Sequence, residues 1–172
     1  MEGEAQATEM VLERLQLRLE EFAGPLEVTL IDLGKRTDSP NDAFYGLRTF
    51  QLMPTVENGC RVAVLVEDAW TIFVELDGEV WVEIFTNPKW AGMGLDDLFD
   101  VLDAAAEGRI ERRTWTRKRD ERVLSKTYSI QLRNGGRWRR IGDNTAPLPL
   151  IWRLFANRSR TQFEPWRARR QD

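Results

Sequence analysis

The chain has 172 residues, of which 42% are hydrophobic and 31% charged, proportions typical of one globular domain with a packed core. It contains no histidine, which excludes serine–histidine and cysteine–histidine nucleophiles, histidine zinc sites and the commonest general base at neutral pH. The single cysteine cannot form an internal disulfide, and the acidic N-terminus lacks the pattern of a secretory signal. No apolar run is long enough to cross a bilayer. We therefore expect a cytoplasmic protein.

The net charge of −3 hides an uneven distribution along the chain. Residues 1–107 hold 22 acidic and 7 basic residues, whereas residues 108–172 hold 6 acidic and 18 basic residues. Most of the basic residues are arginines, which bind carboxylates and phosphates bidentately and stack on aromatic rings. The basic half could therefore pair with the acidic half, or it could bind a polyanion from outside.

The first predicted elements are a helix and a strand. Apolar residues at helical spacing predict an amphipathic helix over residues 8–22, which Gly24 and Pro25 end. Residues 26–33 alternate as a strand does, and the turn-forming residues 34–44 predict a loop.

Four short apolar runs, at residues 47–53, 60–66, 70–76 and 79–85, predict an antiparallel meander. Asp77 and Gly78 fit the two central positions of a type I′ turn, which places Leu76 opposite Glu79. In that register both faces of the hairpin are largely apolar, so we expect these strands to be central and covered on both sides.

A second helix is predicted over residues 95–108, ended by Gly108, with a buried stripe of Leu95, Leu98, Phe99, Leu102 and Ala106. Arginine-rich strands follow at residues 109–140, with one turn at Asp120-Glu121 and another at residues 134–136. Residues 147–159 are compatible with a short third helix.

We therefore predict an α+β domain over residues 1–156, built on a mostly antiparallel sheet with two or three helices. Residues 157–172 form a basic tail, ordered only if Phe163 or Trp166 docks.

The arginine-rich hairpin is the first candidate binding site. A turn at Asp120-Glu121 puts Arg113, Arg117 and Lys126 on the face of Trp115 and Tyr128, and leaves Arg112 on a solvent-exposed face. Arginine interleaved with aromatic rings is typical of single-stranded nucleic-acid binding. The alternative, which we favour, is that the rings are core and the arginines pair with the acidic half. The candidate residues of this site are Arg112, Arg113, Trp115, Arg117, Lys126, Arg137, Arg139 and Arg140.

Acidic residues of the second predicted helix form an acidic strip: Asp96, Asp97, Asp100 and Asp103, continued by Glu107. Such a row could hold a divalent cation or face a basic partner. The solvated face of an amphipathic helix is the more common explanation, so we predict no metal site.

Glu83 is a third candidate, because the predicted register places it among Ile72, Trp81 and Phe85. An unpaired carboxylate there would have a raised pKa and could act as a general acid or base. Arginines are plentiful, so we favour a structural Glu83–arginine pair; Glu75, on the opposite face, has the same ambiguity. Cys60 is interpreted as an inert buried thiol.

The sequence contains neither GxGxxG nor GxxxxGK[ST], and no cofactor is predicted. The leading hypothesis is a non-catalytic, bacterial-type protein-binding domain, such as an immunity, adaptor or inhibitor protein, with aromatic residues anchoring its interface. The first alternative is nucleic-acid binding through residues 109–140. The second is a small hydrolase or ligand-binding domain that uses Glu83 or Glu75. Open faces of opposite charge would also permit a homo-oligomer.

Overall fold

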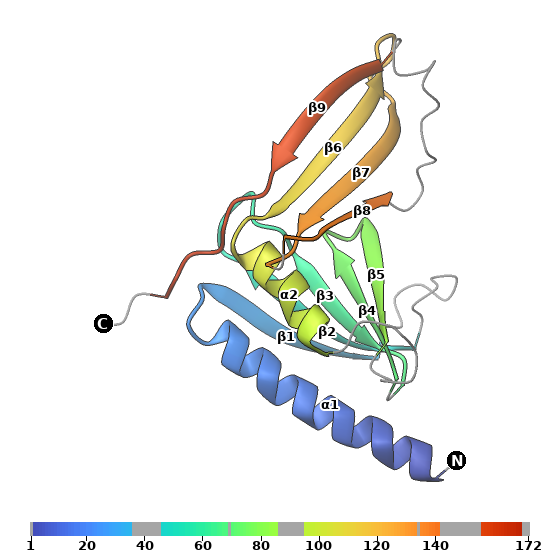
Figure 1. Ribbon diagram of the computed structural model, residues 1–172, viewed down its shortest axis with the longest axis vertical. Coiled ribbons are helices and arrows are strands. Elements are labelled where there is room, and N and C mark those ends of the chain that lie inside the picture. The colour runs from blue at the N-terminus through green and yellow to red at the C-terminus, as the bar shows by residue number, and fades with distance from the viewer. Residues whose placement is uncertain are drawn as a thin grey trace.

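The computed structural model describes residues 2–35, 46–68, 70–85, 95–133, 135–141 and 156–169. Two helices and nine strands lie within these ranges: α1 (Glu2–Ala23), β1 (Val28–Lys35), β2 (Arg48–Pro54), β3 (Val62–Val66), β4 (Thr71–Leu76), β5 (Val80–Phe85), α2 (Leu95–Ala106), β6 (Ile110–Arg117), β7 (Val123–Gln131), β8 (Arg137–Ile141) and β9 (Ala156–Gln162). Figure 1 shows how they are arranged. The predicted α+β class with antiparallel sheet is confirmed. Neither described helix combines the length and apolar character needed to cross a membrane.

The chain builds two antiparallel sheets. The first joins the strand predicted at residues 26–33 to the four strands of the predicted meander, in the order β1-β2-β3-β4-β5. The second has four strands in the order β8-β7-β6-β9 and extends away from the helices in Figure 1. The loop predicted at residues 34–44 falls almost wholly outside the described ranges.

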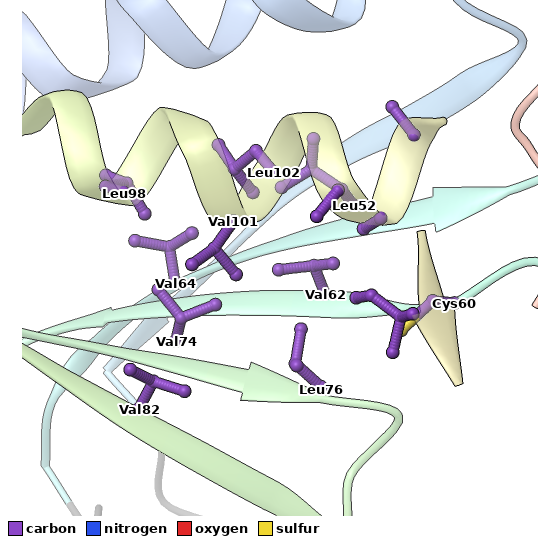
Figure 2. Packing of buried hydrophobic residues seen from close by; sticks show 14 of the residues in the cluster. Leu52, Cys60, Val62, Val64, Val74, Leu76, Val82, Leu98, Val101 and Leu102 are labelled. Atoms are coloured by element: carbon purple, nitrogen blue, oxygen red, sulfur yellow. The ribbon is translucent and has the colours of Figure 1, made fainter. Parts of the chain in front are cut away.

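One face of the five-stranded sheet forms the main core. Both helices pack into the same hydrophobic cluster: Leu15 and Leu19 come from α1, and Leu98, Val101 and Leu102 come from α2. Figure 2 shows the α2 side chains above valines and leucines of β3, β4 and β5. Phe22 of α1 and Phe99 of α2 also meet edge to face, with ring centroids 5.9 Å apart. Burial of apolar surface on this face is the main stabilising contribution to the fold.

The Asp77-Gly78 turn forms as predicted, but the strand register is shifted by one residue. Asp77 and Gly78 have φ angles of 55° and 71°, and the Glu79 amide donates to the Leu76 carbonyl over 3.1 Å. Leu76 is nevertheless opposite Val80, because Glu79 is an extra residue in the connection. A shift of one residue exchanges the faces of β5, so Val80, Val82 and Ile84 reach the core.

The same shift corrects the expectation that both faces of the meander are covered. Trp81 and Glu83 lie on the outer face, where Trp81 keeps 38% of its surface exposed. A small cluster of Ala63 and Leu65, packed by Leu47 and Phe73, buries only part of this face.

The faces of the arginine-rich hairpin also differ from the prediction. Residues 118–122 separate β6 from β7, and a bulge lies between Trp115 and Thr116, so no two-residue turn sets the register. Arg112 is therefore opposite the buried Tyr128, whereas Arg113 and Trp115 are opposite Thr127 and Ser125 on the other face.

The C-terminal segment forms a strand that the sequence analysis did not predict. Ala156–Gln162 is β9 and pairs with β6, although its first residues had been assigned to a short helix. Residues 147–155 lie outside the described part of the chain. Beyond β9, Phe163 and Trp166 are both 5% exposed. The two aromatic side chains on which order in the tail was expected to depend are therefore both buried.

Candidate functional site

A groove lies where the C-terminal segment crosses the ends of both helices. Its volume is about 610 Å³, and we call it the tail groove. One side is lined by Glu21 and Phe22 of the last turn of α1 and by Pro25 and Leu26, which follow it. The other lining residues are Asp103 and Ala106 of α2, Glu107 directly after α2, and Pro165, Trp166 and Ala168 of the C-terminal segment. The Trp166 ring meets Phe22 edge to face, with centroids 6.3 Å apart, and its Nε1 donates to the Cys60 carbonyl over 3.2 Å.

Backbone hydrogen bonds hold the C-terminal wall of the groove in place. The Trp166 amide donates to the Ala106 carbonyl, and the Arg169 amide donates to the Pro25 carbonyl, each over 2.8 Å. The Glu27 amide donates in return to the Arg167 carbonyl over 2.7 Å. The wall is therefore an extended backbone fixed to both helix ends.

Gly108 permits the close approach of this segment. Its φ is +68°, and a Cβ at this position would lie 2.8 Å from the Pro165 nitrogen and 2.9 Å from the Phe163 carbonyl oxygen. A side chain would therefore be strained by its backbone conformation and would also press on the segment that forms the groove.

The rim of the tail groove is acidic. Glu21 is exposed, and Asp103 and Glu107 both pair with Arg133, over 3.2 and 2.9 Å. Hydrogen bonding from Arg133 holds the pKa of Glu107 below its ordinary value. Partial burial, together with the neighbouring charges of Glu107 and Asp100, raises the pKa of Asp103 despite Arg133. An apolar floor edged by three carboxylates suits an apolar side chain with a cation beside it.

The other members of the acidic strip lie outside this groove. Asp96 is exposed, and Asp97 and Asp100 are partly exposed along α2. Within the described ranges no three His, Cys, Asp or Glu side chains gather as metal ligands.

Arg112 and Lys126 turn inward and meet acidic residues of the first half of the chain. Arg112 Nη1 lies 2.9 Å from Asp77 Oδ2 and 3.6 Å from Glu79 Oε2, and the Lys126 ammonium and the Tyr128 hydroxyl both donate to the Glu79 carboxylate. We call these five side chains the junction cluster, because they join the β4–β5 turn to the four-stranded sheet.

Electrostatics in the junction cluster favour the charged carboxylate. Burial alone would raise the pKa of Glu79, but the hydrogen bonds from Lys126 and Tyr128 and the charges of Lys126 and Arg112 outweigh it and lower the pKa. Burial and the Glu79 charge raise the pKa of Tyr128, so its hydroxyl remains a donor. Arg112 was expected on a solvent-exposed face, and this position corrects that expectation.

The remaining candidates of the basic hairpin are spread over several places. Arg113 pairs with Glu111, and Arg117 pairs with Asp120 over 3.2 Å at the tip of the hairpin. Arg137 is exposed at the start of β8. Arg139 and Arg140 pair through their backbones with Ser129 and Tyr128, but their side chains lie outside the described part of the structure.

Glu83 is not the buried, arginine-paired carboxylate that was expected. The register shift places it opposite Phe73 on the partly exposed outer face, and within the described ranges it makes no ion pair. Glu75 lies on the same face, opposite Trp81. Cys60 is fully buried, and burial raises the pKa of its thiol, in line with an inert side chain.

Sequence reasoning missed the tail groove. Its signals were Phe163 and Trp166, two aromatic residues in an otherwise polar segment, and Gly108 at the end of α2. Comparison of the chain with protein-family models, with curated protein sequences and with solved structures gives no significant match in any of the three.

Proposed function

We propose that this chain is a non-catalytic protein-binding domain of the immunity, adaptor or inhibitor kind, acting in the cytoplasm through the tail groove. The observation that carries the proposal is the floor of Phe22, Leu26 and Trp166 edged by Glu21, Asp103 and Glu107. Aromatic residues in a desolvated pocket are the usual anchors of protein interfaces.

The occupant we propose is a peptide segment of a partner protein with one large apolar side chain next to a lysine or arginine. The apolar side chain fills the groove, and the cation meets Glu21 at the rim. Arg133 already offsets part of the charge of Asp103 and Glu107, so Glu21 is the carboxylate with the greatest capacity for a new partner. A charged rim of this kind contributes orientation and partner choice more than affinity.

Selection of displayed random short peptides on the full chain tests the proposal. We expect enrichment of sequences that combine an aromatic or large aliphatic residue with an adjacent basic residue. Enrichment of acidic sequences, or of no sequence class, would contradict the proposed chemistry of the groove.

Two pairs of variants locate the binding of the selected peptides. Ala168→Trp adds a large ring at an exposed lining residue and should abolish binding, whereas Thr29→Trp adds the same ring on the outer face of β1 and should not. Glu21→Lys should weaken binding, whereas Glu13→Lys makes the same charge change at an exposed position of α1 outside the groove lining. Calorimetric titration that finds wild-type affinity in Ala168→Trp would reject the groove as the binding site.

A further inference from the structure

The basic residues on the two faces of the four-stranded sheet differ in their ion-pair partners. On the face of Tyr128, Arg112 and Lys126 are neutralised by Asp77 and Glu79. On the opposite face, β6 and β9 bring together Arg113, Trp115, Arg158 and Arg160 around one carboxylate, that of Glu111. Among the described residues, the ion pairs of the second face involve Glu111 alone, so this face keeps a positive surplus.

Arg113 and Arg160 are directly opposite each other in neighbouring strands. Two like charges in such a cross-strand pair repel unless a counter-charge lies between them. Glu111 supplies it: Arg113 Nε and Arg160 Nη2 both bind its carboxylate, the latter at 2.5 Å. The Glu111 side chain is only 6% exposed, so one buried carboxylate orients two guanidiniums, and the Arg160 side chain remains 61% exposed.

A cation–π contact extends this arrangement along the strands. Arg158 is opposite Trp115, and its guanidinium carbon lies 5.5 Å from the centroid of the Trp115 ring. This cation–π contact holds the guanidinium near the ring while its N–H groups stay available to an acceptor. Arg158 is exposed, and within the described part of the chain it forms no ion pair with a carboxylate.

We propose that this face, carried by Arg113, Trp115, Arg158 and Arg160, binds single-stranded nucleic acid without sequence preference. Three guanidiniums hold the phosphates, and the partly exposed Trp115 with Arg158 above it provides a place for a base to pack. A sheet face with arginines and an aromatic ring offers the contacts that single strands use, namely phosphate pairing and sequence-tolerant stacking. The site is separate from the tail groove and does not depend on the function proposed for it.

Fluorescence anisotropy with labelled poly(dT) and poly(U) tests the proposal on the full chain. We expect binding at low salt that weakens as salt rises, with a log–log slope of about −2 for three neutralised phosphates on a single strand. Duplex DNA of equal length should bind more weakly, because its bases are not available for stacking. Equal binding of duplex and single strand, or no binding to either single strand at low salt, would reject the proposal.

Matched variants separate this face from general attraction to a basic chain. Arg158→Glu with Arg160→Glu should reduce affinity at least about tenfold. Arg167→Glu with Arg169→Glu makes the same charge change at exposed residues of the C-terminal segment and should reduce affinity much less. Equal losses in the two double variants would show non-specific attraction and overturn the assignment of the site.

A third variant tests stacking. Trp115→Ala should weaken binding roughly tenfold or more, and Trp115→Phe should retain most of it. Circular dichroism identifies any variant that fails to fold, in which case Arg158→Glu alone, which changes an exposed side chain outside the Glu111 ion pairs, decides the question. If an acidic peptide binds this face and competes with poly(dT) at equal concentration of charge, the site is a general anion surface and not a nucleic-acid site.

Discussion

The five-stranded sheet and the four-stranded sheet share one hydrophobic cluster but differ in how much charge pairing adds to their positions. The first buries an apolar face under α1 and α2, with side chains such as Val64, Val74 and Leu102 fully buried. The second sheet contributes Ile110, Tyr128 and Ile130 to the same hydrophobic cluster, and the junction cluster and the C-terminal segment add polar ties between the two sheets. Apolar alternation can therefore specify the first sheet, whereas the position of the second depends both on apolar packing and on which opposite charges meet.

The largest effect on stability is expected from a change in the apolar packing between α2 and the five-stranded sheet. Leu102→Ala leaves a cavity between α2 and the five-stranded sheet, because the surrounding β-strands cannot close it fully. We expect a loss of about 2–5 kcal/mol in the free energy of unfolding, measured by urea denaturation. A loss below about 1 kcal/mol would mean that this core is loosely packed.

A smaller effect on stability is expected from a change in the junction cluster. Tyr128→Phe keeps the ring in place and removes only the hydroxyl, which donates to Glu79 and also interacts with Arg112, so it tests the part of this hydroxyl in the junction cluster. Hydrogen bonds to charged groups contribute about 1.5–3 kcal/mol, and urea denaturation should show a loss in that range. An unchanged midpoint would show that the junction cluster does not stabilise the fold.

A third effect concerns the attachment of the C-terminal segment. Gly108→Ala forces a side chain into the left-handed region and against Pro165, so we expect a loss of about 1–2 kcal/mol. Hydrogen exchange should increase at the amides of Trp166 and Arg169, which bond to the two helix ends. If exchange rises equally throughout the chain, the segment is not a separately stabilised unit.

The smallest expected effects concern how the stability of the fold depends on pH. The pKa of Glu79 is lowered in the fold, so its contribution to stability is present above its ordinary value of 4.5 and is lost as pH falls through the folded pKa. Glu79→Gln should therefore flatten the acid side of the stability profile, measured by urea denaturation at a series of pH values.

Asp103 should behave in the opposite sense, because its pKa is raised. Its ionised form is disfavoured in the fold, so protonation as pH falls relieves a destabilising contribution. Asp103→Asn should change stability at neutral pH by only a few tenths of a kcal/mol, in the stabilising direction, since the side chain is partly exposed. A marked loss in Asp103→Asn would mean that its pair with Arg133 outweighs desolvation.

The sequence predicted the meander and α2 well because each has a regular apolar period that local packing preserves. Register was predicted less well. The Asp77-Gly78 turn was read correctly, but nothing in the local preferences of Asp, Gly and Glu reveals that Glu79 adds a residue to the connection. One residue of shift was enough to move Glu83 from a buried position to the outer face.

Strand β9 and the tail groove escaped prediction for a different reason. Six consecutive residues of β9, 157–162, are polar and most of them are exposed, so no alternation marks the strand. The groove forms only where the ends of α1 and α2 meet residues 165–168, which are far apart in the sequence. The aromatic residues Phe163 and Trp166 were visible, but their docking position depends on tertiary contacts.

The most direct test of the central claim is a ¹H–¹⁵N correlation spectrum of the full chain during titration with a selected apolar and basic peptide. The account predicts that shifts concentrate at Phe22, Leu26 and Ala106 and at the Trp166 indole N–H, whose acceptor is the Cys60 carbonyl. Shifts concentrated instead around Phe73 and Trp81, on the outer face of the five-stranded sheet, would contradict it.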